Sequence, residues 1–163
     1  LYILEFARYV GAKRVIYSSS SSVRGNGNGP ENPYGASKYM PESMCKVWAS
    51  LYGIDTVCLR YFNVYSPCQE AGGPYATAIA NYDGYFGGAW FDVGTGNNIS
   101  LNEIKAIVHN YFPEVSFKYV EDRPGDVFLT KADISPLVDL GWSPKNNIYD
   151  GIRECFERLR SEI

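Results

Sequence analysis

The spacing of apolar residues predicts alternating helices and strands along the first part of the chain. Apolar side chains recur every three or four positions over residues 1–10, which is typical of a helix. Residues 14–17 are mostly β-branched or aromatic, so we expect a short strand that runs into a serine tract. Asn32 precedes a proline, a pair favoured at the start of a helix, which we expect over residues 33–51. Residues 56–65 predict a second buried strand.

A proline inside the expected helix at 33–51 should disturb it. Pro41 lacks the amide hydrogen that a helix uses, and its ring clashes with the preceding turn at a cost of about 3 kcal/mol. We therefore expect a kink or a break just after Lys38.

The second half of the chain predicts shorter elements. Residues 70–90 are rich in Gly, Ala, Tyr and Asn, and no firm element can be assigned there. The expected elements beyond them are strands at 90–93 and 117–120, a helix that a capping box opens at residues 100–103, a brief helix capped by Asp133 or Ser135, and an amphipathic helix at 148–163.

Strands that alternate with helices predict an α/β domain of three layers with a largely parallel sheet. The strands at 14–18 and 56–62 should be adjacent and parallel, because the helix between them can serve as a right-handed crossover. The length of 163 residues fits one domain.

Composition and charge exclude several classes of protein. Hydrophobic residues make up 45% and charged residues 20% of the chain, as in globular rather than disordered proteins. The net charge of −3 is unlike the basic footprint of a nucleic-acid-binding protein, and no apolar run approaches the ~20 residues of a membrane helix. The four cysteines lack C-x-x-C spacing, so we expect reduced thiols and a cytoplasmic protein. The single histidine, His109, cannot supply a metal cluster, and we expect no metal.

A tyrosine and a lysine four residues apart are candidates for acid–base chemistry. Tyr34 and Lys38 project from one face of the expected helix. A free tyrosine loses its proton at about pH 10, and a lysine cation beside it favours the phenolate. The pair alone is more typical of a solvated helix face. Ser20 favours the catalytic interpretation, because it should lie at the carboxyl end of a strand, where open α/β sheets bind ligands.

Sequence motifs in a fixed order cover nearly the whole chain. They are the strand and serine tract at 15–23, N-P-Y-G-A-S-K at 32–38, L-R-Y-F-N-V-Y-S-P at 59–67, F-D-V-G-T-G at 91–96, R-P-G-D at 123–126, A-D-I-S at 132–135 and L-G-W-S-P at 140–144. Together they resemble the extended short-chain dehydrogenase/reductases of the NAD-dependent epimerase/dehydratase family. They are similar in particular to the C-terminal part of the UDP-glucose and UDP-N-acetylglucosamine 4-epimerases, in which F-N-V-G-T-G replaces F-D-V-G-T-G.

The resemblance implies NAD as cofactor, a UDP-sugar as substrate, and a reaction in which a hydride leaves C4, the keto sugar turns, and the hydride returns to the other face. Tyr34 would be the base, Lys38 the cation that favours its phenolate and binds the nicotinamide ribose, and Ser20 the group that orients the sugar hydroxyl. The implied cofactor contacts are Ser18, Tyr34, Lys38, Tyr61 and Phe62. The implied substrate contacts are Ser20, Asn63, Arg123 and Asp126.

The chain also departs from the family pattern. The cofactor-binding glycine turn and the ribose-binding acid are absent. The glycines at 25–29 do not replace that turn, because Pro30 stands where the fingerprint needs glycine. Arg24 occupies a position at which the family has tyrosine. We therefore expect a fragment: a partial Rossmann-like parallel sheet over residues 1–66, whose N-terminal half is missing, and a reduced C-terminal substrate domain over 67–163 with a further strand near 90–94.

Two interpretations follow from this pattern. The chain is either part of an NAD-dependent UDP-sugar 4-epimerase, with a homodimer as one arrangement, or an inactive remnant or interaction subunit. Among related reactions, dehydration is disfavoured because Ser21 and Ser22 occupy the place of the acidic pair of the dehydratases, while decarboxylation stays open. The particular sugar and nucleotide, activity of the chain alone, and the oligomeric state are also open.

Overall fold

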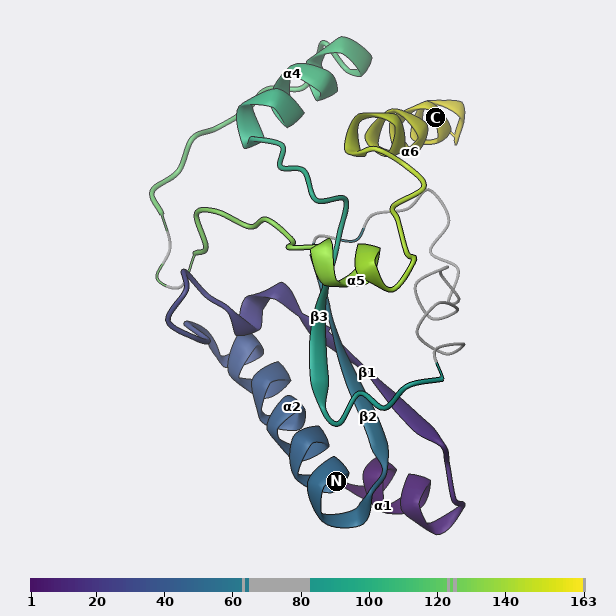
Figure 1. Ribbon diagram of the computed structural model, residues 1–163. Helices are drawn as coiled ribbons and strands as arrows, with labels where there is room; N and C mark the ends of the chain where they lie inside the picture. Colours follow the sequence, from purple (N-terminus) through teal and green to yellow (C-terminus); the bar gives the residue numbers. More distant parts are fainter. Residues whose placement is uncertain (63, 65–82, 123, 125, 163) are drawn as a thin grey trace.

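The computed structural model describes residues 1–62, 64, 83–122, 124 and 126–162. In this part of the chain, three parallel strands form a sheet in the order β1-β2-β3 (Figure 1). The strands are β1 (Arg14–Ser20), β2 (Asp55–Tyr61) and β3 (Ala89–Val93), and a 3-10 helix, η1 (Ser21–Val23), follows β1. The α-helices are α1 (Tyr2–Tyr9), α2 (Pro33–Tyr52), α4 (Leu101–Tyr111), α5 (Ser135–Asp139) and α6 (Ile148–Glu162).

Strand β2 is the centre of the sheet and of the hydrophobic core. Val57, Cys58 and Leu59 have no exposed surface. A central strand of a parallel sheet is covered on both faces, which explains why its sequence is a nearly continuous apolar run. The predicted pairing is confirmed, because β1 and β2 are adjacent and parallel and α2 connects them.

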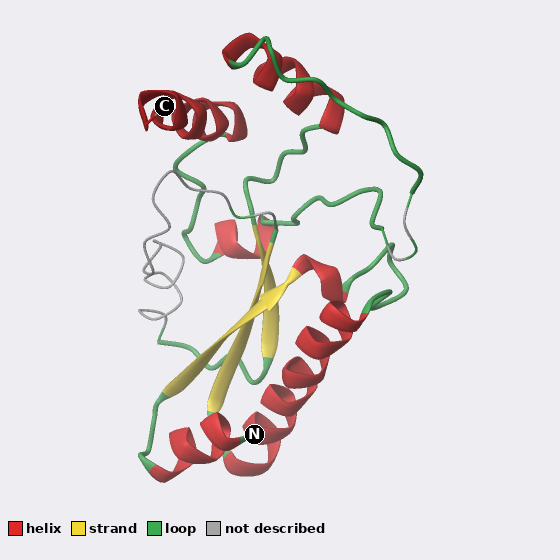
Figure 2. Ribbon diagram, turned by 180° about the vertical axis from the view of Figure 1, so that it is seen from behind, coloured by secondary structure: helices red, strands yellow, loops and turns green. Residues whose placement is uncertain are grey.

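Different helices cover the two faces of the sheet (Figure 2). On one face, Leu4 of α1 and Cys45 of α2 pack against Cys58. On the opposite face, Leu137 of α5 and Trp142 pack against Val57, Leu59 and Val93. This arrangement is the three-layered α/β architecture that the alternation of elements predicts.

Two further helices lie together beyond the carboxyl ends of the strands (Figure 1). The ring of Phe156 on α6 lies 5.7 Å from that of Tyr111 on α4 and 5.9 Å from that of Phe112. Helix α4 begins with the predicted capping box, in which Ser100 and Glu103 exchange hydrogen bonds. These hydrogen bonds lower the pKa of Glu103.

Asp55 holds the other end of the sheet together. Its carboxylate accepts a hydrogen bond from Nε of Arg14 at 2.6 Å and bonds from the amides of Phe86 and Gly87 at 2.7 and 3.1 Å. One buried side chain of β2 therefore joins the start of β1 to the segment that leads into β3.

Two expectations about local structure are wrong, and one of two alternatives is excluded. Helix α2 continues through Pro41, so the alternative of a break is excluded and that of a kink stays a prediction. The turns of α2 pack on the sheet on both sides of the proline, and such packing supplies most helical stability. The second strand ends at Tyr61 rather than at residue 65. Residues 117–120 form no strand; they are exposed and, within the described residues, have no neighbouring strand to pair with.

The brief helix α5 also starts differently from the expectation. Ile134 is its N-terminal cap and provides no side-chain hydrogen bond. Asp133 still contributes, because its carboxylate accepts the amide hydrogen of Ser135 at 3.1 Å. Within the described residues, no helix is both long enough and apolar enough to cross a membrane.

Candidate active site

Helix α2 starts where the sequence predicts, close to the carboxyl end of β1. Asn32 has an extended backbone, and its Oδ1 accepts the amide hydrogen of Gly35 at 2.8 Å. Pro33 occupies the first turn, where a missing amide hydrogen costs nothing. The cap therefore fixes where helix α2 begins and, with it, the position of the Tyr34 backbone.

Gly35 lets the first turn of α2 touch the turn that follows β1. A Cβ atom on residue 35 would lie 2.5 Å from the carbonyl oxygen of Ser22, closer than real Cβ contacts come. The absence of a side chain at this position therefore allows the backbone beside Tyr34 to lie against η1.

Ser20 ends β1 and caps η1. Its Oγ accepts the amide hydrogen of Ser22 and donates to Oγ of the same residue, both at 3.2 Å. The residue is 9% exposed. The hydroxyl thus lies at the carboxyl end of a parallel strand, as predicted. The catalytic interpretation also requires that the Ser20 and Tyr34 hydroxyls face one cleft, and this is a further prediction.

Lys38 links α2 to β1 next to Tyr34. Its Nζ donates to the carbonyl oxygen of Ser18 at 3.1 Å. The same nitrogen lies 6.0 Å from the centre of the Tyr34 ring and 5.7 Å from that of Tyr17. Tyr34 is 56% exposed, so its ring is accessible from solvent while the cation lies beside it.

The neighbouring Tyr17 belongs to the support of this lysine rather than to the acid–base pair. Its hydroxyl donates to the backbone carbonyl of Lys38 at 3.4 Å. Burial, followed by the thiols of Cys58 and Cys45, raises the pKa of Tyr17. Tyr17 therefore keeps its proton, and we assign no proton transfer to it.

A buried ion pair one turn further along α2 fixes the helix on the sheet. Glu42 accepts two hydrogen bonds from Arg60 of β2, from Nε at 2.9 Å and from the terminal nitrogen at 2.6 Å. It also accepts the hydroxyl hydrogen of Ser19 at 2.6 Å. Because Ser19 lies between Ser18 and Ser20, this carboxylate sets the register of α2 against the serine tract.

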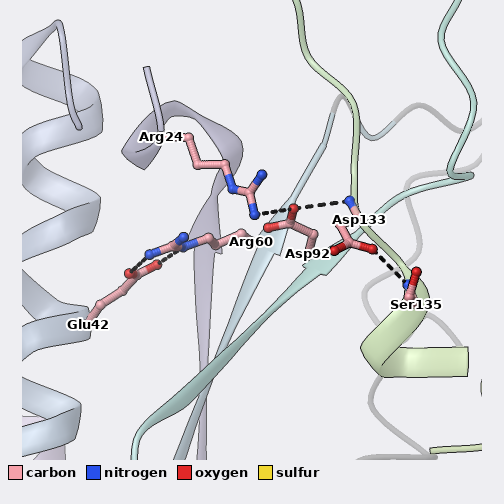
Figure 3. Close-up of polar contacts among 6 residues, drawn as sticks. All are labelled: Arg24, Glu42, Arg60, Asp92, Asp133 and Ser135. Atoms are coloured by element: carbon pink, nitrogen blue, oxygen red, sulfur yellow. Dashed lines mark hydrogen bonds and ion pairs between the residues drawn. The ribbon is translucent and has the colours of Figure 1, made fainter. Parts of the chain in front are cut away.

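A second ion pair connects the loop after η1 to β3 (Figure 3). Arg24 lies 3.0 Å from Oδ2 of Asp92, and the same oxygen accepts the amide hydrogen of Asp133 at 3.2 Å. The other oxygen, Oδ1, is buried without a hydrogen-bond partner among the described residues. Burial raises the pKa of Asp92, although the Asp133 amide and the guanidinium groups of Arg24 and Arg60 oppose the rise.

These two ion pairs support the elements around the candidate site, and the sequence motifs did not predict them. A charged residue inside an apolar strand, such as Arg60, signals a buried partner, because arginine is rarely buried unpaired. Arg24 and Asp92 each replace a residue of the family motif, tyrosine and asparagine respectively. The structure explains both replacements at once, because the two side chains pair with each other.

The other predicted site residues fall into three groups. Tyr61 and Phe62 lie at the end of β2, where the Phe62 amide donates to the carbonyl of Val93 at 2.9 Å. Asp126 is half-buried and lies beside the loop that follows η1. Asn63 and Arg123 lie outside the described residues.

The chain was compared with known proteins. The model of the NAD dependent epimerase/dehydratase family matches residues 1–83, which is just over half of the chain. The chain belongs to the NAD-dependent epimerase/dehydratase family.

Relatives and solved structures agree with this family. The chain is 25% identical to the UDP-glucuronate 4-epimerase of Thermodesulfobacterium geofontis, an alignment that covers all of this chain and 64% of the relative. It superposes with a TM-score of 0.85 on the UDP-glucuronic acid 4-epimerase of Bacillus cereus in complex with UDP-glucuronic acid and NAD, at 21% identity and over 99% of this chain and 66% of that one. An NDP-hexosamine 5,6-dehydratase of tunicamycin biosynthesis gives 0.84 at 20% identity, over 98% and 67% of the two chains. The chain thus spans about two thirds of the length of these proteins, and both superpositions show the Rossmann fold of the family.

The described residues fit one end of the family's cofactor better than the other. Lys38, Tyr34 and Ser18 bring an ammonium, a phenol and a carbonyl oxygen together, which are donors and acceptors that could bind the hydroxyls of a ribose. Pyrophosphate binding in this fold uses unpaired amides at a helix N-terminus, but the Gly35 amide of α2 already donates to Asn32. In the glycine loop before α2, the amides of Gly27 and Gly29 likewise donate to the Arg24 carbonyl, so these three amides are not free to bind a phosphate in this structure.

Among the described residues, no three histidine, cysteine, aspartate or glutamate side chains are grouped to hold a metal ion. Cys45, Cys58 and Cys155 are unbridged, and Cys68 lies outside the described residues.

Because of the close approach at Gly35, replacing this helical glycine by alanine should lower the stability of the protein, whereas such a replacement usually raises it. Helix propensity alone would make Gly35→Ala stabilising by about 1 kcal/mol. Because the added Cβ would meet the Ser22 carbonyl, we expect instead a loss of about 1–3 kcal/mol in the free energy of unfolding. Urea denaturation monitored by circular dichroism measures this change.

The control for this prediction is Ser37→Ala in the same turn. Ser37 is exposed, and its hydroxyl donates only locally, to the carbonyl of Tyr34 at 2.7 Å. We expect a change within about 0.5 kcal/mol for this variant. A Gly35→Ala protein as stable as the unsubstituted chain would show that α2 does not lie against η1.

Proposed function

We propose that this chain carries the acid–base residues of an NAD-dependent UDP-sugar 4-epimerase, with Tyr34, Lys38 and Ser20 as its catalytic residues. The observation that carries the proposal is the position of the Lys38 ammonium, between the carbonyl of Ser18 and the ring of Tyr34 at the carboxyl end of β1. In the same proposal, residues 1–66 are part of a dinucleotide-binding domain, residues 67–163 are a shortened substrate region, and the protein is cytoplasmic.

Each of the three side chains has a chemical role in this proposal. Tyr34 takes the proton from the 4-hydroxyl of the sugar and later returns a proton to the same oxygen. Lys38 places its positive charge beside the Tyr34 ring and donates to the nicotinamide ribose. Ser20 hydrogen-bonds the same sugar oxygen and holds it towards Tyr34. Bound NAD would supply the hydride acceptor that epimerisation at C4 requires.

The nucleotide end of the substrate would be held by Asp126 together with two further residues. Asp126 is the acceptor for a nucleotide hydroxyl, and Arg123 and Asn63 are its proposed companions. Tyr61 ends the central strand, Phe62 follows it, and both are proposed to line the nicotinamide side. The proposal names a UDP-sugar because of the similarity to the UDP-sugar epimerases and does not specify which sugar.

Dehydration is the less favoured reaction for this arrangement. Elimination of water needs an acid close to the catalytic hydroxyl residue, and the two positions after Ser20 are Ser21 and Ser22. Ser22 is already engaged with Ser20 in the turn. Neither hydroxyl provides a carboxyl group for the elimination.

We expect the chain alone to bind NAD weakly and to show no measurable epimerisation. The pyrophosphate of NAD would lose several charge-assisted hydrogen bonds, each worth about 1.5–3 kcal/mol. Such a loss moves a micromolar site into the millimolar range or beyond. Calorimetric titration of NAD into the purified chain measures this affinity, and micromolar binding would contradict the half-site interpretation.

The acid–base assignment is tested on the substrate side, where NAD is not needed. Titrations of the ¹⁵N-labelled chain with UDP-glucose and with UDP, followed by NMR, give two dissociation constants. If Tyr34 contacts the sugar, UDP-glucose should bind about three- to tenfold more tightly than UDP, the effect of about one hydrogen bond. Tyr34→Phe should remove that difference and leave the affinity for UDP unchanged.

The matched control is Tyr39→Phe on the same helix. Tyr39 is 48% exposed, comparable with Tyr34 at 56%. This variant should retain the preference for UDP-glucose. Equal affinities for UDP and UDP-glucose in the unsubstituted chain, or an unchanged preference in Tyr34→Phe, would contradict the proposed role of Tyr34.

A further inference from the structure

The glycine-rich loop between η1 and α2 is a folded structure in its own right. The carbonyl of Arg24 accepts the amide hydrogens of Gly27 at 2.9 Å and of Gly29 at 3.2 Å. The side chain of Arg24 pairs with buried Asp92, so the base of the loop is fixed to β3. Gly25 has a φ of +51° and no room for a Cβ atom, because the carbonyl of Gly29 and the side chain of Glu31 lie against it.

Asn26 extends from this loop to a segment 100 residues away in sequence. Its Nδ2 donates to the carbonyl oxygen of Asp126 at 3.3 Å, and its Oδ1 accepts the amide hydrogen of Phe128 at 3.2 Å. The two contacts flank residue 127 and hold the backbone on both sides of it. A single side chain thus connects the loop to the backbone of Asp126.

Glu31 orients this asparagine. One of its carboxylate oxygens accepts the backbone amide hydrogen of Asn26, and the other accepts a hydrogen from Nδ2, both at 2.8 Å. An asparagine amide has two donor hydrogens and one carbonyl oxygen. Both donors and the acceptor are engaged here, so the amide has one preferred orientation.

We propose that Asn26, held by Glu31, is a positioning residue for Asp126, fixing that residue relative to the catalytic serine turn. The inference rests on the proposed function, in which Asp126 binds a nucleotide hydroxyl. The loop follows η1 (Ser21–Val23), which Ser20 caps, so Asn26 links the proposed sugar-binding part of the site to the proposed nucleotide-binding part. This link would position the part of the site that holds the nucleoside diphosphate end of a substrate.

The link itself is tested without ligand. Amide hydrogen exchange of the ¹⁵N-labelled chain reports the hydrogen bond from the Phe128 amide. Asn26→Ala should accelerate exchange at Phe128 by about tenfold, whereas Asn28→Ala should not. Asn28 is an exposed asparagine of the same loop and takes no part in the contacts described above. Unchanged exchange at Phe128 in Asn26→Ala would overturn the proposal.

The effect on nucleotide binding is tested with UDP as the probe. Asn26→Ala should raise the dissociation constant of UDP about three- to tenfold at an unchanged melting temperature, and Asn28→Ala should leave it unchanged. Asn26→Asp should also weaken binding, because its carboxylate would face Glu31, and Glu31→Gln in the same chain should restore part of the affinity. Faster exchange at Phe128 with unaltered UDP affinity would overturn the positioning role.

The outcomes separate this inference from the function on which it rests. If the unsubstituted chain fails to bind UDP at millimolar concentration, the nucleotide assignment of Asp126 fails and the positioning role falls with it. Slower exchange at Phe128 in the unsubstituted chain than in Asn26→Ala would then still establish the contact. If the unsubstituted chain binds UDP and Asn26→Ala binds it with the same affinity, the nucleotide site stands and the role of Asn26 is refuted.

Discussion

The carboxylate of Glu42 is the group on which the arrangement of this molecule depends. It lies in the layer between α2 and the sheet and accepts hydrogen bonds from Arg60 of β2 and Ser19 of β1. A buried carboxylate is costly unless it is paired and its remaining acceptor sites are satisfied. A rotation or translation of α2 against the strands would break these hydrogen bonds, so the ion pair favours the observed register of the helix.

The geometry of the candidate site depends on this register of α2 against the sheet. Lys38 lies one helical turn before Glu42, and Ser18 and Ser20 flank Ser19, so the contact between Glu42 and Ser19 brings the lysine to the Ser18 carbonyl. Arg60 extends the support towards β3, because its guanidinium lies 4.0 Å from the centre of the Trp90 ring. The ion pair between Asp92 and Arg24 then connects β3 to the loop that contains Asn26. Buried charges between α2 and the sheet thus position Lys38 and the serine tract, which contain the residues proposed as catalytic, at the carboxyl ends of the strands.

Local patterns predict much of this structure, and long-range contacts account for the rest. The capping residues Asn32 and Ser100 mark the starts of α2 and α4, because a cap depends only on neighbours in sequence. The Y-x-x-x-K pattern likewise places Tyr34 and Lys38 on one helix. The break expected at Pro41 does not occur, because the local cost of proline is offset by packing that the local sequence does not encode. Local sequence patterns also cannot predict the contact from Asn26 to Asp126, because the two residues are 100 positions apart.

The central claim, that the Glu42–Arg60 pair fixes α2 on the sheet, is tested most directly by a double-mutant cycle. The free energy of unfolding is measured by urea denaturation for Glu42→Gln, Arg60→Met and the double variant. Each single substitution leaves a buried charge without its partner and should cost about 3–5 kcal/mol. The double variant should cost about 2–3 kcal/mol less than the sum of the two single losses. Losses that add within about 0.5 kcal/mol would mean that the two residues act independently and would contradict the account.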